Sequence, residues 1–387
     1  MELSLYIHWP FCLSKCPYCA FNSIAYSVDE EIFKKFENAL LKELKISLQK
    51  FSTVSINTIF WGGGTPSLMS PSAVYEILNF LHKNYRIQDN AEVSLEANPG
   101  TFDKKKLQKF KEAGINRLSL GIQSFSDKNL RFLGRIYDGN RAHVSAEVVS
   151  QIFKNFSFDF IYGYASQEED SLINDLQLAC ELGCPHISCY QLTIEDGTPF
   201  FNRYFKGEIR LYEENRQADL YESINSFLSN HNLYRYEVSN HARKGYECKH
   251  NLCYWEYGNF LGIGPGAHSR LLSQNGRYAF ENEKNPFKWL EQIQIGKDYT
   301  VNKQYLFKQE ELEEIFIMGM RLSKGLNMKT LSKNIPTEIL EKVITHKKIN
   351  FLISEGLLVP EALNNNYLQL TSEGFLKLDS IIEFFLA

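Results

Sequence analysis

Three of the eight cysteines in this 387-residue chain lie within eight residues of one another. Cys12, Cys16 and Cys19 are separated by three and then by two residues, and they follow an apolar segment at residues 4–8. A loop with these gaps can turn all three sulfurs onto one soft centre, because thiolates favour iron–sulfur clusters or zinc. The segment therefore predicts a strand that ends in a ligand-bearing loop.

The number of nearby cysteines limits what this loop can hold. Most protein clusters take four cysteines, but the position two after Cys19 is Phe21 and the next cysteine is Cys180. Three ligands on a four-iron cluster would leave one iron open to an exchangeable ligand, much as catalytic zinc keeps an open position. Two alternatives stay open from the residues alone: three buried, inert thiols, and a zinc site completed by His8 or a distant residue.

Strand and helix patterns alternate along the first half of the chain. The predicted strands are residues 4–8, 58–61, 92–97, 117–121, 156–161 and 186–191, and the predicted helices include 29–49, 103–113, 168–182 and one that opens near residue 71. Such alternation indicates parallel strands with crossover helices. Six units are too few for an eight-stranded barrel. We therefore expect an α/β fold, an open, partial (β/α)6 barrel with polar motifs at the carboxyl ends of its strands.

The pattern changes after about residue 195. We expect a helix at 212–230, a short strand at 234–238 and a loop at 239–269 that is rich in His, Cys, Gly and aromatic residues. A helical region near 309–324, an apparent hairpin at 357–371 and a last helix then form a smaller, mostly helical C-terminal domain of winged-helix-like shape. The expected domains are residues 1–195, 196–300 and 301–387.

Composition narrows the classes of partner and compartment. The net charge of −4 gives no general attraction to nucleic acid, so we expect no nucleic-acid partner. The N-terminus does not have the pattern of a signal peptide, and no apolar run approaches the length of a membrane span. We therefore expect reduced cysteines in the cytoplasm, and we leave peripheral contact with a membrane open. The aromatic fraction of 14% suits an aromatic core or a flat apolar ligand.

Polar residues stand at or just after four of the predicted strands. Three glycines and Thr65 follow the strand at 58–61, where glycine lets the backbone approach a ligand or simply make a tight turn. Glu96, Gln123, Arg135 and Asp159 follow the next strands. Each of these alone is typical of a surface charge or a cap. At one rim, however, the carboxylates can accept hydrogen bonds from hydroxyl groups, and the arginine can pair with a carboxylate.

The Cys-x3-Cys-x2-Cys segment after an apolar strand resembles the radical S-adenosylmethionine superfamily. The flanking residues 6–11, Tyr-Ile-His-Trp-Pro-Phe, resemble its coproporphyrinogen dehydrogenase-like branch, which includes HemN enzymes and HemW haem chaperones. The resemblance implies that Cys12, Cys16 and Cys19 hold a 4Fe-4S cluster whose open iron binds S-adenosylmethionine. It implies an electron transfer that cleaves the sulfonium to a 5′-deoxyadenosyl radical, in a site that excludes water.

The same resemblance implies roles for the polar residues. Gly63, Gly64 and Thr65 match the segment that meets the methionyl amino group, and Arg135 matches the residue that binds the methionyl carboxylate. Glu96 and Asp159 would bind ribose hydroxyls, Gln123 would lie close by, and Tyr6 and Tyr18 would border the nucleotide. Tyr137 departs from the family, which usually has a histidine at this position.

A second segment distinguishes between the branches. Residues 249–255 contain His-Asn-x-x-Tyr-Trp, which resembles the HemW motif and implies that His250 ligates haem. On chemistry alone, a hydrogen-bonded histidine in an aromatic loop explains the segment as well. HemN-type enzymes carry a fourth cysteine where this chain has Phe21, and they have an extension before the cysteine strand, which here begins at residue 4. Both differences favour the HemW branch.

The leading hypothesis is a haem chaperone on a radical S-adenosylmethionine scaffold. It would bind haem or a porphyrin, the cluster and S-adenosylmethionine, and it would deliver haem to an acceptor such as a membrane respiratory enzyme. The alternatives are an oxygen-independent coproporphyrinogen III dehydrogenase, which decarboxylates its substrate oxidatively by a radical, and a radical methyltransferase. The sequence leaves open whether the chain forms a homodimer.

Overall fold

The computed structural model describes residues 1–51 and 53–387, and one sheet of twelve strands dominates it. The central strands run parallel, in the order β11 (Phe260–Ile263), β1 (Glu2–Trp9), β4 (Ser55–Gly63), β5 (Arg86–Ala97), β6 (Arg117–Gln123), β7 (Asn155–Tyr162) and β8 (His186–Gln191). Antiparallel strands extend both edges: β12 (His268–Ser273), β13 (Gly276–Asn282) and β14 (Thr300–Tyr305) beyond β11, and β10 (Asn240–Ala242) and β9 (Tyr234–Arg235) beyond β8.

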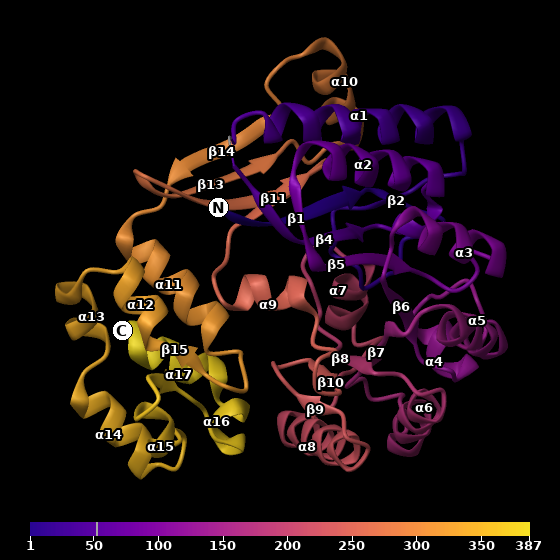
Figure 1. Ribbon diagram of the computed structural model, residues 1–387. Helices are drawn as coiled ribbons and strands as arrows, with labels where there is room; N and C mark the ends of the chain where they lie inside the picture. The colour runs from indigo at the N-terminus through magenta and orange to yellow at the C-terminus, as the bar shows by residue number, and fades with distance from the viewer. Residues whose placement is uncertain (52) are drawn as a thin grey trace.

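Helices cover the outer side of the parallel strands (Figure 1). They are α1 (Glu30–Leu48), α2 (Pro71–Asn84), α3 (Lys104–Ala113), α4 (Asp127–Phe132), α5 (Gly139–Ile152), α6 (Glu169–Glu181) and α8 (Glu214–Asn230). The short helix α7 (Pro199–Phe205) instead contacts the cysteine loop, where the backbone nitrogen of Phe200 donates to the Pro17 carbonyl oxygen at 2.9 Å. The side chain of Asp29 starts α1 by accepting from the backbone nitrogens of Glu31 (3.0 Å) and Ile32 (3.1 Å). The expected open α/β barrel is the fold observed.

The stretch 239–269 is not the loop that we predicted from sequence. It contains β10, the helix α9 (Lys249–Trp255) and β11, and β11 pairs in parallel with β1 as a seventh parallel strand. The six predicted strand–helix units are present, and β11 adds a seventh parallel strand that we did not predict. A strand of four residues in a glycine-rich segment carries too little periodicity to be recognised, and its pairing with β1 joins residues about 255 positions apart.

The C-terminal domain is mostly helical, as predicted. It consists of α11 (Lys308–Gly319), α12 (Met328–Asn334), α13 (Thr337–Val343), α14 (His346–Ser354), α15 (Pro360–Leu363), α16 (Ser372–Leu376) and α17 (Leu378–Leu386), after α10 (Pro286–Ile295) of the barrel. The predicted hairpin is only partly present, because the short helix α15 interrupts it. A single bridge joins Leu358 to Leu370, and β16 (Tyr367–Leu368) pairs instead with β15 (Leu326–Asn327). No helix among the described residues is long and apolar enough to cross a membrane.

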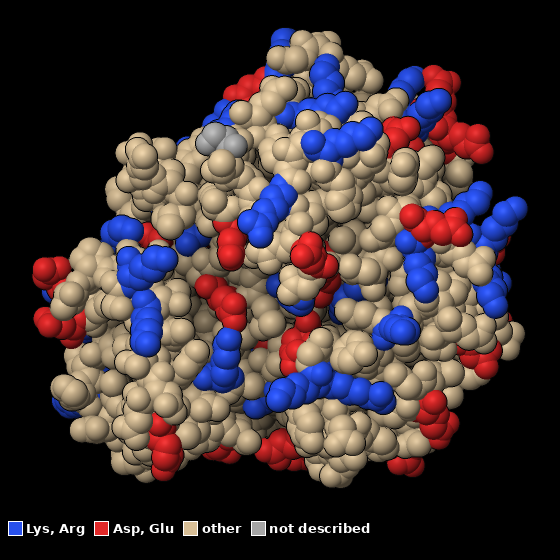
Figure 2. Space-filling model, in the orientation of Figure 1, with Lys and Arg blue, Asp and Glu red and all other residues tan. Residues whose placement is uncertain are grey.

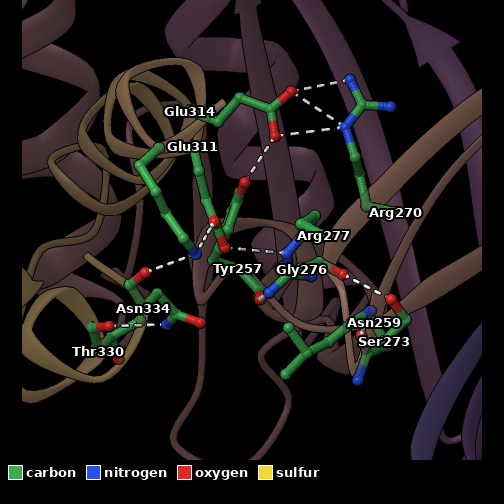
Figure 3. Close-up of polar contacts among 12 residues, drawn as sticks. Tyr257, Asn259, Arg270, Ser273, Gly276, Arg277, Glu311, Glu314, Thr330 and Asn334 are labelled. Carbon is green, nitrogen blue, oxygen red and sulfur yellow. Dashed lines mark hydrogen bonds and ion pairs between the residues drawn. The ribbon is translucent and has the colours of Figure 1, made fainter. Parts of the chain in front are cut away.

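Charged side chains join this domain to the edge strands of the sheet (Figure 3). Glu314 of α11 pairs with Arg270 of β12 at 2.8 Å and accepts from the hydroxyl of Tyr257 at 2.8 Å. Glu311 and Arg277 are almost completely buried and lie 3.7 Å apart, beyond hydrogen-bonding distance. Because Tyr257 follows α9, these contacts also fix the end of that helix against the C-terminal domain.

Candidate cofactor site

The cysteine loop is closed by two short strands. β2 (Phe11–Cys12) and β3 (Ile24–Ala25) pair in parallel just beyond β1, so the residues between them form a loop at its carboxyl end. The ammonium group of Lys15 tightens this loop by donating to the carbonyl oxygens of Phe21 (3.0 Å) and Ser23 (2.9 Å). All three cysteines are free, partly exposed thiols. They are therefore available as ligands on one short loop.

The surroundings of Cys12 and His8 help to decide whether the cysteine loop can form a zinc site. Burial raises the pKa of the Cys12 thiol, while hydrogen bonds with Thr65 and Ser23 oppose that shift. His8 cannot complete a zinc site as it stands, because its Nδ1 lies 3.1 Å from the Tyr6 hydroxyl and its Nε2 lies 2.8 Å from the Asn22 carbonyl oxygen. Across residues 1–51 and 53–387, no group of three or more His, Cys, Asp or Glu side chains is arranged to hold a single metal ion.

The glycine segment lies directly against β1 and the cysteine loop. A Cβ on Gly64 would stand 2.7 Å from the carbonyl oxygen of Phe11, and one on Gly63 would stand 2.5 Å from the ring of His8. Gly63 also has a φ of 108°, in the region that favours glycine. The backbone nitrogen of Thr65 donates to the Phe11 carbonyl at 2.8 Å. Close packing within the protein thus explains these glycines, and it brings Thr65 beside the cysteines.

Arg135 reaches the same place from the loop after β6. Its guanidinium donates to the Tyr18 hydroxyl (2.5 Å) and the Asn98 side-chain oxygen (3.3 Å), and it lies over the rings of Tyr18 and Tyr137. Its buried Nε has no hydrogen-bond partner among the described residues. A small pocket is lined by Cys16, Thr65, Asn98, Arg135 and other residues. A positive, partly unpaired guanidinium therefore faces a pocket beside the cysteine loop.

Two carboxyl groups lie inside the barrel near the carboxyl ends of β5 and β7. Glu96 accepts from the backbone nitrogen of Gly63 at 3.2 Å, and burial together with repulsion from Asp159 raises its pKa to about 8. Asp159 accepts from the hydroxyls of Ser119 (2.9 Å), Ser157 (3.1 Å) and Ser188 (2.7 Å). Burial raises the pKa of Asp159 despite these bonds. The sequence predicted both carboxyl groups at this rim.

Gln123 and Asn98 complete the rim. Gln123 is buried and has a φ of 66°, unusual for a residue other than glycine. A Cβ on Gly121 would meet the side-chain atoms of both Asn98 (2.8 Å) and Gln123 (2.9 Å). The Asn98 amide donates to Thr65 Oγ1 at 3.0 Å and its oxygen accepts from Arg135, so it links two predicted site residues. We did not predict this role for Asn98, although it lies two residues after Glu96.

His250 lies apart from this rim, deeper in the barrel. It is 1% exposed, and both ring nitrogens are engaged: Nδ1 with the Thr58 hydroxyl at 2.7 Å and Nε2 with the Tyr254 hydroxyl at 2.8 Å. Its ring stacks on Phe60, with centroids 5.0 Å apart, and on Tyr6, 6.3 Å apart. Burial lowers the pKa of His250 to about 3. The imidazole is neutral, but it offers no free nitrogen in this arrangement.

The residues present fit a cluster and an amino-acid-bearing nucleotide. Three thiols share one loop, and the exposed Phe21 stands where a fourth cysteine would follow Cys19. The unpaired Nε of Arg135 can meet a carboxylate. Glu96 and Asp159 add oxygen acceptors for hydroxyl groups at the same rim. A structural zinc site needs only four Cys or His ligands, whereas this site combines three thiols with a guanidinium and two carboxyl groups.

Comparison with known proteins agrees with this geometry. The family model of the radical SAM superfamily matches residues 6–179, and that of the HemN C-terminal domain matches residues 306–376. The heme chaperone HemW of Haemophilus influenzae is 36% identical over 391 residues, covering 99% of this chain and 98% of the relative. The Escherichia coli heme chaperone HemW is 34% identical over 393 residues, covering 100% and 98%. The chain belongs to the HemW family of radical SAM proteins.

More distant relatives of this HemW family member share its architecture. The mouse protein named radical S-adenosyl methionine domain-containing protein 1, mitochondrial, is 33% identical over 386 residues, covering 98% of this chain and 86% of the relative. The solved structure of coproporphyrinogen III oxidase (HemN) from Escherichia coli superposes with a TM-score of 0.80. It covers 99% of this chain and 90% of that chain at 21% identity, so this likeness concerns the fold alone.

Proposed function

We propose that this chain is a haem chaperone that binds haem, a 4Fe-4S cluster and S-adenosylmethionine, and that delivers haem to an acceptor protein. The full-length similarity to proteins named heme chaperone HemW supports the role. One structural observation carries it further. His250, in the HemW-like segment, stacks on Tyr6 of β1, and the cysteine loop begins at the carboxyl end of that same strand. The proposed haem ligand therefore contacts the strand that leads into the proposed cofactor site.

The proposed cofactor roles are those that the resemblance to radical SAM proteins implies. Cys12, Cys16 and Cys19 would hold the cluster, and Arg135 would neutralise the methionyl carboxylate while Gly63, Gly64 and Thr65 approach the amino group. Glu96 and Asp159 would accept from the ribose hydroxyls, with Tyr6, Tyr18 and Gln123 at the border. Together, cluster and S-adenosylmethionine supply one-electron reductive cleavage of a sulfonium. The chain itself contributes fixed dipoles and charges in a site with little water.

Haem ligation would use the imidazole of His250. The neutral ring is the form that ligates iron, and burial keeps this ring neutral at physiological pH. Its Nε2 becomes available only when the Tyr254 hydroxyl releases it. Haem binding therefore requires the Tyr254 side chain, on the same helix α9, to turn away from His250, which suits a protein that must also give its cargo up.

Partners and compartment complete the proposal. The acceptor would be a haem-requiring protein such as a membrane respiratory enzyme, reached from the cytoplasm by transient contact, and the chaperone would act as a homodimer with domains at 1–195, 196–300 and 301–387. Figure 2 shows Lys and Arg interspersed with Asp and Glu on the face shown.

The test uses anaerobically reconstituted protein in two aliquots. One receives haemin, and its Soret absorbance is compared among wild type, His250→Ala and the control His82→Ala, which changes an exposed histidine of α2. The other receives dithionite, S-adenosylmethionine and coproporphyrinogen III, and the mass of the porphyrin product is measured by mass spectrometry. We expect stoichiometric haem that weakens only in His250→Ala, and no decarboxylated porphyrin. Loss of carboxyl groups from the porphyrinogen would instead identify a dehydrogenase, despite Phe21.

A further inference from the structure

The helix α9 closes the barrel interior at its amino-terminal end. The backbone nitrogens of Lys249 and His250 donate to the Glu92 carboxylate at 3.0 and 3.3 Å, and Thr58 of β4 bonds the His250 ring. Thr58 lies near the start of β4 and Glu92 lies at the middle of β5, whereas Gly63 and Glu96 lie at or next to the ends of the same strands. The floor of the interior, formed by α9, thus faces the proposed nucleotide site along the barrel axis.

The side chain of His250 supports Tyr6 from below. The two rings stack at 27° with centroids 6.3 Å apart, and Phe60 stacks on both of them. From above, Tyr6 is confined by Gly62, where a Cβ would stand 2.8 Å from its ring, and its hydroxyl lies 3.1 Å from His8. Tyr6 borders the proposed nucleotide site. Its position therefore depends on an imidazole that lies outside that site.

A second chain of hydrogen bonds joins the start of α9 to Asp159. The backbone nitrogen of Cys248 donates to the Tyr236 hydroxyl at 3.3 Å, and that hydroxyl lies 2.9 Å from His186 Nε2. The other nitrogen of His186 lies 2.8 Å from the Ser157 hydroxyl, which donates to Asp159 at 3.1 Å. Cys248, His186 and Ser157 are buried, and Tyr236 and Asp159 are partly buried. A displacement of α9 would disturb both proposed contacts to the nucleotide.

The far end of α9 is held by the C-terminal domain. Arg321 lies over the Trp255 ring with a distance of 5.4 Å to its centroid, and Glu256 pairs with Lys324 at 2.5 Å. In Figure 2 the molecular surface is hollowed near the place where Figure 1 shows α9, between this domain and the barrel. The helix that carries His250 therefore contacts both the barrel and the C-terminal domain.

We propose that haem ligation by His250 and S-adenosylmethionine binding against Tyr6 oppose each other, because α9 has one packed and one released position. In the packed position His250 supports Tyr6 and both its nitrogens are engaged. In the released position α9 has moved away from Tyr6 and the Tyr254 side chain, on the same helix, has turned away from Nε2, so the imidazole can reach iron but no longer supports Tyr6. His250 is thus a positioning residue for the nucleotide as well as a haem ligand. By linkage, each ligand weakens the other by the same factor. This inference rests on the proposed function and adds the regulation of its two sites.

The test measures each affinity with and without the other ligand. Full-length protein with reconstituted cluster is dialysed anaerobically against labelled S-adenosylmethionine, with and without saturating haemin, and is titrated with haemin with and without S-adenosylmethionine. We expect each ligand to weaken the other by at least about fivefold, the lower end of usual couplings. Tyr254→Phe removes the competitor for Nε2 and should tighten haemin binding about 2- to 12-fold, the range for one hydrogen bond. His82→Ala should change neither affinity.

His250→Ala separates positioning from simple ligation. Without haemin, this variant should already bind S-adenosylmethionine more weakly than wild type, and haemin should no longer change that affinity. Thr58→Val repeats the test from the Nδ1 side with a side chain of similar volume. If haemin binds through His250 but leaves the affinity for S-adenosylmethionine unchanged, the inference is overturned and the proposed function stands. If haemin does not bind, or binds equally to His250→Ala, both fail.

Discussion

Replacing Arg277 with Met should destabilise the protein by breaking a buried charge pair at the junction of barrel and C-terminal domain. The Arg277 side chain is 3% exposed, and that of Glu311, 3.7 Å away, is 0% exposed. The guanidinium also donates to the carbonyl oxygens of Gly258 (3.2 Å) and Tyr257 (3.1 Å), and it lies 4.1 Å from the centroid of the Tyr257 ring. Met keeps a side chain of similar apolar length, but the Glu311 carboxylate and the carbonyl oxygens of Gly258 and Tyr257 each lose a partner.

The expected loss is about 3–5 kcal/mol of unfolding free energy, the cost of removing one partner from a buried pair. Lys308 contacts Glu311 at 2.6 Å and would still compensate part of its charge after Arg277 is removed. The loss should therefore lie at the lower end of this range. The assay is guanidinium denaturation of the apoprotein followed by circular dichroism, which also reports whether the C-terminal domain unfolds first.

The matched control removes a solvent-exposed pair. Lys377→Met breaks the contact with Glu373, whose side chain is as exposed as that of Lys377, and should cost no more than about 1 kcal/mol. The double variant Arg277→Met with Glu311→Leu should recover much of the loss, since apolar replacement of a whole buried pair is often neutral. A loss below about 1 kcal/mol in Arg277→Met alone would refute this account of the junction.

Three further predictions concern the site. Arg135→Leu should weaken S-adenosylmethionine binding about 10- to 100-fold in equilibrium dialysis, the effect of one charge-assisted hydrogen bond, while the exposed Arg141→Leu should not. Gly64→Ala, whose Cβ would stand 2.7 Å from a carbonyl oxygen, should displace the cysteine loop and lower the iron content after reconstitution; full iron content would contradict that reading. Because burial raises the pKa of Glu96 from 4.5 to about 8, the folded state holds an extra proton in that window. The free energy of unfolding should then fall as pH rises from 4.5 to 8, by at most about 1.4 kcal/mol per pH unit. The unfolding free energy of Glu96→Gln should fall less steeply over the same range. Equal slopes for wild type and variant would contradict this prediction.

The central strands could be predicted because their patterns are local. Residues 4–8 and 58–61 are apolar runs that end at conspicuous loops, and α1 shows its apolar stripe over nineteen residues. The helix α9 and the strand β11 could not be predicted in this way, since each has seven residues or fewer. Their positions depend on distant partners, Glu92 for α9 and β1 for β11.

The sequence likewise predicted some features of the site and missed others. Glu96 and Asp159 lie in the last residues of β5 and in the second half of β7, so their place near one rim follows from the parallel order of the sheet. The close packing of Gly63 and Gly64 against His8 and Phe11 is not visible in the sequence, and their approach to a ligand stays a prediction. The link from His250 to Tyr6 joins residues 244 positions apart in the sequence, and no local pattern of either segment reveals it.

The most direct test of the central claim is the iron and sulfide content of anaerobically reconstituted protein, together with its electron paramagnetic resonance spectrum before and after S-adenosylmethionine is added. Wild type should hold about four irons and four sulfides per chain, and S-adenosylmethionine should change the spectrum of the reduced cluster. Replacing Cys12, Cys16 or Cys19 by Ser should remove the cluster, while Cys180→Ser should keep it. One zinc per chain in wild type, or a full cluster in any of the three variants, would contradict the account.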